Sequence, residues 1–106
     1  MAHGRVVRLR TGQGGRYLDA WRDADGGLHL DGQDLGPPTA VVSPRGEVEW
    51  FSTIAGEDVP RLLELLDAPK DADILDVLEA HWRGERAAEL EAKIRRSDIP
   101  VARHVI

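Results

Sequence analysis

The sequence contains no cysteine. This absence excludes disulfide frameworks, thiolate zinc sites and cysteine nucleophiles, and it leaves the redox compartment open. Long hydrophobic runs are also missing, because none approaches the roughly 18 apolar residues that a membrane-spanning helix requires. The first residues, MAHGRVVR, lack the apolar segment of a secretory signal. We therefore expect a soluble, cytoplasmic protein without a membrane partner.

Length and composition are those of an ordinary folded domain. The chain has 106 residues, of which 42% are hydrophobic, and this is enough to bury one core. A chain of this size hides roughly two thirds of the surface that its unfolded form exposes, so it needs neither disulfides nor metal ions to fold. We expect a single domain over residues 1–106.

The net charge of −5 hides a gradient along the chain. The first 22 residues carry five arginines and one aspartate, whereas the remaining residues carry nine basic and eighteen acidic side chains. Nucleic-acid binding depends on neutralising phosphates, so an acidic chain is a poor candidate for it. A nucleic-acid-binding module is nevertheless one alternative, in which Arg8 and Arg10 share a strand face. The basic residues of that alternative are Arg5, Arg8, Arg10, Arg16 and Arg22.

The first half of the chain has the pattern of strands and turns. Residues 12–15, GQGG, link two strand-like segments, and we interpret them as a hairpin turn because a phosphate-binding Walker loop opens a helix. Residues 32–46 contain Gly-Pro-Pro and Ser-Pro, which are typical of a surface excursion. The expected strands are residues 5–11, 16–22, 28–31 and 47–54.

The aromatic pair Trp50 and Phe51 lies in a segment whose residues alternate in direction. Val48, Trp50 and Ile54 point to one face of the sheet, and Phe51 points to the other. Both rings therefore cannot lie in a one-sided core. Either residues 32–46 fold over Phe51, or Phe51 stays exposed as an anchor for a partner protein.

The second half has the spacing of amphipathic helices. Pro60 fits only the first turn of a helix, Asp71 is the expected N-cap of the next helix, and Gly84 ends that helix. On the third helix, Glu91 and Arg95 have the spacing of an i,i+4 ion pair. The expected helices are about residues 57–67, 71–83 and 85–96, and residues 101–105 can form a final strand. Because strands and helices are segregated along the chain, we expect an α+β fold: an antiparallel sheet with three helices on one face.

No motif in the sequence indicates a reaction. The four histidines show no metal-ligand spacing, and no serine or threonine stands in an activating context. We expect no cofactor and no bound metal. A small enzyme or ligand-binding domain is an alternative, with a pocket between sheet and helices and with His81 and His29 as acid/base groups.

An acidic stripe is expected on the outer side of the second helix. It consists of Asp71, Asp73, Asp76 and Glu79. The functional interpretation is a surface that binds a basic protein. The alternative interpretation is a solvated helix face with capping residues. Together with Phe51, the acidic stripe supplies the predicted partner-binding residues.

Several segments carry a resemblance to a known group of proteins. They are DGGLHLDGQDLGP at residues 25–37, EVEWF at 47–51, EDVPRLLELL at 57–66 and Ile-Pro at 99–100. Over residues 17–102 the chain thereby resembles a group of small uncharacterised actinobacterial proteins. The resemblance implies a similar layout and no particular activity. In size, acidity and single-domain form the chain also looks like bacterial immunity proteins and antitoxins, which is an analogy of shape.

The hypothesis that the sequence favours is a non-enzymatic protein-binding module, with an immunity-type or antitoxin-type inhibitor as its specific form. The enzyme or ligand-binding domain and the nucleic-acid module are the two alternatives.

Overall fold

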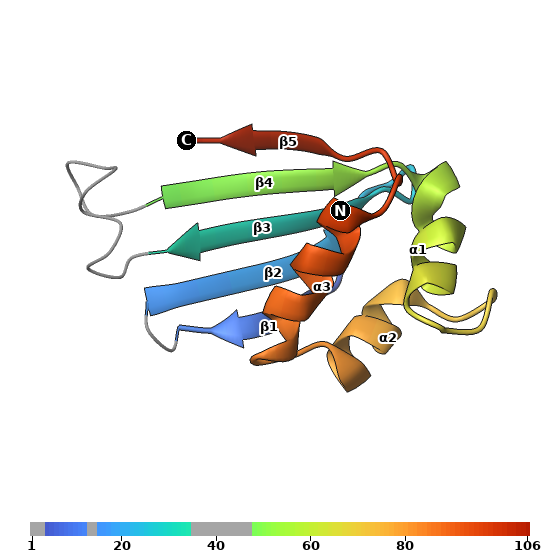
Figure 1. Ribbon diagram of the computed structural model, residues 1–106, viewed down its shortest axis with the longest axis horizontal. Coiled ribbons are helices and arrows are strands. Elements are labelled where there is room, and N and C mark those ends of the chain that lie inside the picture. The colour runs from blue at the N-terminus through green and yellow to red at the C-terminus, as the bar shows by residue number, and fades with distance from the viewer. Residues whose placement is uncertain (1–3, 13–14, 35–47) are drawn as a thin grey trace.

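The sheet and the helices occupy separate halves of the chain. The computed structural model describes residues 4–12, 15–34 and 48–106. The strands are β1 (Val6–Thr11), β2 (Arg16–Arg22), β3 (Leu28–Asp34), β4 (Val48–Ile54) and β5 (Ala102–Val105). The helices are a short 3-10 turn, η3 (Gly56–Asp58), followed by α1 (Val59–Leu65), α2 (Ile74–His81) and α3 (Arg86–Arg96) (Figure 1).

The five strands form one antiparallel meander in the order β1-β2-β3-β4-β5. This arrangement confirms the predicted α+β class and the predicted final strand. Because side chains alternate along each strand, residues that pair across neighbouring strands form a row on one face of the sheet, and the next row lies on the other face. One row consists of Val7, Ala20, Leu30, Ser52 and Arg103. The next row, on the opposite face, consists of Arg8, Asp19, Asp31, Phe51 and His104.

All three helices pack on the face that contains Leu30. Strand residues from this face and inward residues from every helix belong to one buried core. In α3 the buried residues are Ala87, Leu90 and Ile94, as the sequence pattern predicts. Helix α3 crosses in front of the sheet, while β5 forms the far edge of the sheet beside β4 (Figure 1).

Strand β3 runs to Asp34, which is longer than the predicted strand 28–31. Gly32 lies in the middle of this strand, opposite Trp50 on β4. A side chain at position 32 would overlap the indole ring of Trp50. Glycine therefore does not end the strand here, because its missing side chain makes room for the ring of the neighbouring strand.

The helix boundaries differ from the sequence prediction at the second helix. Pro60 does lie in the first turn of α1. Gly84 has φ 66°, but α2 ends earlier than predicted, at His81 with Trp82 as its C-cap. Helix α2 starts at Ile74, and its N-cap is Asp73, whose carboxylate accepts a hydrogen bond from the Leu75 amide at 2.8 Å. The prediction of Asp71 as the N-cap is therefore wrong, because the chain becomes helical only after Asp73.

Strand β1 contains an irregularity that separates two arginines. Its register with β2 shifts between Arg8 and Arg10. Arg8 pairs with Asp19, whereas Arg10 pairs with Leu18, whose side chain is fully buried under the helices. The prediction that Arg8 and Arg10 share a face is therefore wrong, because a bulge interrupts the simple alternation.

Two further predictions are that residues 32–46 cover Phe51 and that the chain contains no membrane-spanning helix. Residues 35–47, which contain most of the predicted surface excursion, lie outside the described residues, so the covering of Phe51 by this segment stays a prediction. Among the helices of the described residues, none is long and apolar enough to cross a membrane.

Candidate functional site

Ring side chains gather on the face of the sheet that carries none of the described helices. They belong to Tyr17, Trp21, His29, Phe51 and His104. We call this surface the ring face. The rings of Trp21 and His29 stack with centroids 4.0 Å apart, and the rings of Phe51 and His104 lie 6.5 Å apart.

The ring face has a hollow beside Phe51. Its volume is about 290 Å³, and Tyr17 also lines it. Asp19, Asp31 and Glu49 place carboxylates at this hollow, and among the described lining residues Arg8 supplies the one basic side chain. Because Arg8 is already paired with Asp19 at 2.8 Å, the described residues that line the hollow carry a net negative charge.

Trp21 is held in place by hydrogen bonding as well as by stacking. Its indole Nε1 donates to the Asp31 carboxylate at 2.8 Å. A ring that is fixed on both its edge and its face loses little conformational freedom when a partner binds. Trp21 is therefore held in one position before any partner binds.

His29 is held by hydrogen bonds on both ring nitrogens. Nε2 lies 2.7 Å from Asp23 Oδ2, and Nδ1 lies 3.2 Å from Thr53 Oγ1. Because a carboxylate only accepts hydrogen bonds, Nε2–H is the donor to Asp23. In the neutral imidazole Nδ1 then accepts from the Thr53 hydroxyl, which gives a chain from carboxylate to imidazole to hydroxyl.

Asp23 begins the turn that leads into β3. The hydrogen bond from His29 holds the pKa of the Asp23 carboxyl below its ordinary value, and hydrogen bonds from the amides of Gly27 and Asp25 act in the same direction. Both amides donate to Asp23 Oδ1 at 2.9 Å. Asp23 is therefore an ionised anchor that organises the turn and the imidazole together.

The acidic stripe is engaged within the molecule. Asp73 caps α2, while Asp76 and Glu79 bind the guanidinium of Arg5 at 2.6 Å and 2.8 Å. The bond to Asp76 raises the pKa of Arg5 above its ordinary value. Of the four residues, the described structure leaves only Asp71 exposed without a partner. The stripe therefore offers a weaker docking surface than its sequence suggests, because its charge is partly neutralised.

Four of the five amino-terminal arginines are also engaged. Arg5 binds the acidic stripe, Arg8 binds Asp19, and Arg16 binds Asp34 at 3.3 Å. Arg22 donates to the carbonyl oxygen of Gly26 at 2.7 Å. Guanidinium groups that already hold carboxylates contribute less to phosphate binding, so this arrangement does not support the nucleic-acid alternative.

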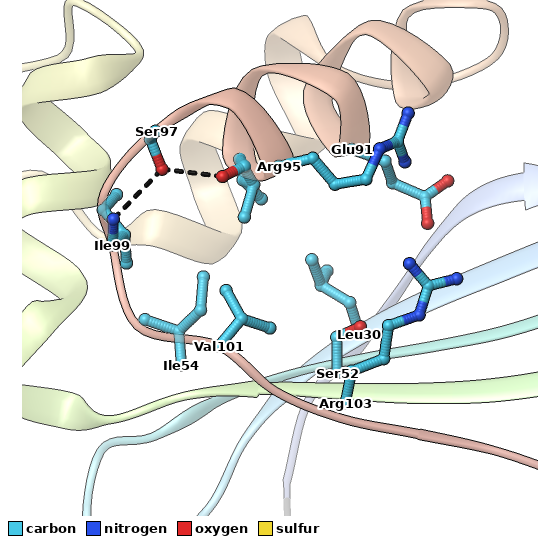
Figure 2. Close-up of a pocket in the computed structure, with 10 residues that line it drawn as sticks. Leu30, Ser52, Ile54, Glu91, Arg95, Ser97, Ile99, Val101 and Arg103 are labelled. Atoms are coloured by element: carbon cyan, nitrogen blue, oxygen red, sulfur yellow. Dashed lines mark hydrogen bonds between the residues drawn. The ribbon is translucent and has the colours of Figure 1, made fainter.

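A cavity of about 290 Å³ lies between α3 and the β4–β5 edge of the sheet. Leu30, Ile54, Ile94, Ile99 and Val101 form its apolar lining, as Figure 2 shows for most of them. The turn after α3 closes one end: Ser97 Oγ donates to the carbonyl oxygen of Ile94 at 2.7 Å and accepts from the Ile99 amide at 3.2 Å.

Charged side chains gather at the other end of this cavity. Arg95 from α3 and Arg103 from β5 extend toward the same end, where the carboxylate of Glu91 also lies (Figure 2). Glu91 Oε2 accepts a hydrogen bond from Trp50 Nε1 at 3.0 Å. Within the described part of the chain, no ion pair joins Glu91 to Arg95, so the pair expected from their spacing does not form.

The predicted acid/base histidines do not lie in this cavity. His29 belongs to the ring face, on the opposite side of the sheet, and His81 lies at the end of α2 beside Trp82. Among the described residues, no group of three or more metal-ligating side chains converges. The acid/base roles proposed for His29 and His81 at a pocket between sheet and helices are therefore not supported.

Comparison with known proteins does not suggest a function for this chain. No family model, no curated protein and no solved structure matches this chain.

Two features of the site are not apparent from the sequence. The ring face gathers residues from four different strands, and the cavity joins β3, β4 and β5 to α3. Alternation predicts which direction each strand residue faces, but it does not predict which strands are neighbours. The position of Phe51 on the face opposite to Trp50 is the signal in the sequence that indicates the ring face.

Proposed function

We propose that the chain is a non-enzymatic protein-binding module that holds a basic protein partner on its ring face. The observation that carries this proposal is the negatively charged hollow beside Phe51, lined by Tyr17, Asp31 and Glu49. Aromatic rings next to carboxylates suit an inserted arginine or lysine, which gains both ion pairing and cation–π contact.

The chemistry of the ring face supports association rather than simple exposure to solvent. Phe51 is half-buried at the centre of its strand, and the stacked pair Trp21 and His29 lies on the same face. Buried aromatic anchors surrounded by polar groups carry most of the binding energy in protein interfaces. The net negative charge of the hollow accelerates encounter with a basic partner and selects against acidic ones.

The size and acidity of the chain support a more specific form of this proposal. In size and acidity the chain looks like immunity proteins and antitoxins, which bind and inhibit a cognate protein. The basic partner is then an enzyme or toxin whose activity falls when its basic surface is covered by the ring face.

The test is site-specific photo-crosslinking in a lysate of the source organism. A photoreactive phenylalanine analogue replaces Tyr17 at the hollow in one protein and Lys93 on α3 in the control protein. We expect a stoichiometric crosslinked partner from position 17 only. The captured protein should be basic, and its capture should be reduced by Phe51→Ala and by added salt.

Two results would overturn the proposal. One is crosslinking of the same protein from both positions with equal yield. The other is a captured partner whose yield is unchanged by Phe51→Ala, measured with protein whose circular dichroism shows that the variant is folded. Failure to find any stoichiometric partner, together with turnover of a small molecule, would favour an enzyme instead.

A second candidate function, hydrolysis of an ester, is favoured by the hydrogen-bonded chain Asp23, His29 and Thr53. In such a chain the imidazole accepts the Thr53 hydroxyl proton while the oxygen attacks the ester carbonyl carbon; the C–O bond to the alcohol then breaks and the alcohol leaves with the proton. Water then cleaves the acyl group from Thr53 as a carboxylic acid. The test measures release of p-nitrophenol from p-nitrophenyl acetate by the unaltered protein, Thr53→Val and the control Thr11→Val. Equal rates for all three proteins would remove this candidate.

A further inference from the structure

We propose that the cavity between α3 and the β4–β5 edge binds a small monocarboxylate with an apolar tail. This inference is independent of the proposed protein partner, because the cavity lies on the helix side of the sheet and the ring face lies on the other. The cavity has an apolar end and a charged end, and this polarity defines the orientation of the ligand.

The apolar end provides the surface for the tail. Leu30, Ile54, Ile94 and Ile99 are all at least 90% buried, with exposed fractions of 3%, 1%, 6% and 7%. They belong to the core itself, so the tail would contact side chains that are already fixed by packing. Removing hydrocarbon from water against this surface is the main source of affinity.

The charged end provides the headgroup site. Arg95 and Arg103 approach it from different elements, and neither guanidinium has an ion-pair partner within the described residues. This distinguishes them from Arg5, Arg8 and Arg16, which are all paired with carboxylates. A guanidinium that is not already paired can donate its hydrogen bonds to a carboxylate of the ligand.

Glu91 limits the charge that the headgroup can carry. Its carboxylate is held at the charged end by the hydrogen bond from Trp50, so the two arginines and Glu91 together supply one net positive charge. One negative charge on the ligand balances this end, while a second would meet Glu91. The geometry therefore favours a monocarboxylate over a dicarboxylate or a phosphate.

The volume sets the length of the tail. A cavity of about 290 Å³ corresponds to the liquid volume of roughly ten water molecules. Octanoate, which has eight carbon and two oxygen atoms, matches this size and is the natural probe. The hydroxyl of Ser52 lies at the cavity wall between Leu30 and Arg103 in the sheet register, where it can donate to the carboxylate.

The test is calorimetric titration of the full chain with octanoate, compared with 1-octanol and with octanedioate. We expect saturable binding of one octanoate and at least about tenfold weaker binding of the other two, because one lacks the charge and the other has too much. Equal binding of octanoate and 1-octanol would overturn the proposal, since the arginines would then contribute nothing.

Substitutions of residues that line the cavity test whether octanoate binds there. Arg95→Gln and Arg103→Gln should each weaken octanoate binding about tenfold. Arg96→Gln is the matched control, because Arg96 is on the same helix but does not line the cavity. Ser52→Leu, which fills the cavity, should abolish binding. Equal weakening by Arg96→Gln, or unchanged binding in Ser52→Leu, would place octanoate elsewhere and overturn the proposal.

Discussion

The indole Nε1 of Trp50 donates a hydrogen bond to Glu91 Oε2 at 3.0 Å, across 41 residues of sequence. This bond ties β4 to α3 and holds the carboxylate of Glu91, which lines the cavity. The ring of Trp50 thus has two different neighbours: the backbone of Gly32 on β3 and the carboxylate of Glu91 on α3.

The first prediction concerns the contact between Gly32 and Trp50. Gly32→Ala should lower the free energy of unfolding by about 1–3 kcal/mol, because the new methyl group overlaps the indole ring. Urea unfolding measures the change. Gly4→Ala is the matched control, since no atom of the described residues lies within 4 Å of a side chain added there. Equal stability of the two variants would show that Trp50 does not need the space at position 32.

The second prediction concerns the hydrogen bond from Trp50 to Glu91. In a double-mutant cycle, Trp50→Phe and Glu91→Ala should show a coupling of about 1 kcal/mol in the free energy of unfolding. The control cycle replaces Glu91→Ala with Glu89→Ala, because Glu89 lies on the same helix but binds Arg86. Coupling of the same size in both cycles would contradict a specific bond between Trp50 and Glu91.

The third prediction distinguishes two N-cap residues of α2. Asp73→Ala should lower the free energy of unfolding by about 1 kcal/mol, because the Leu75 amide loses its acceptor. Asp71→Ala should change it by less than about 0.5 kcal/mol, as is usual for an exposed residue. Thermal unfolding followed by circular dichroism measures both. A larger loss for Asp71→Ala would restore the cap that the sequence predicts.

The fourth prediction concerns pH. The pKa of Asp23 is lower in the folded protein than its ordinary value, chiefly because His29 donates to it. The ionised carboxylate therefore stabilises the fold above the ordinary pKa of about 4, and this contribution is lost as pH falls through the lower, folded-state pKa. The stability difference between the unaltered protein and Asp23→Asn should accordingly shrink on acidification.

The lowered pKa of Asp23 can also be measured directly. Carboxyl titration by NMR should show a higher midpoint for Asp23 in His29→Gln than in the unaltered protein, because the largest cause of the lowered pKa is weakened. Identical midpoints would mean that the amides of Gly27 and Asp25 alone hold the carboxylate ionised.

Particular residues show how far the sequence predicts the fold. Pro60 marks the start of α1 correctly, because proline fits the first turn of a helix. In contrast, α2 ends at His81 and its C-cap is Trp82, two residues before Gly84. Asp71 and Asp73 are both good caps in sequence, and only the path of the chain between α1 and α2 selects Asp73. Gly32 looks like the end of a strand until Trp50 is placed beside it.

The candidate site is less predictable than the fold. The sequence separates Trp50 from Phe51 by face and so indicates that one ring lies away from the helices. It does not indicate that Arg5 neutralises Asp76 and Glu79, more than 70 residues away. It also suggests a pair between Glu91 and Arg95, whereas Trp50 provides the partner of Glu91.

Alternation of apolar residues, helical spacing and turn residues determined the α+β class, the strands and the approximate helices, because each of these signals acts between residues close in sequence. The neighbours of each charged side chain, the gathering of rings on one sheet face and the cavity beside α3 were decided only by the tertiary structure. The physical reason is that charge pairing and cavity shape depend on side chains that folding brings together from distant segments.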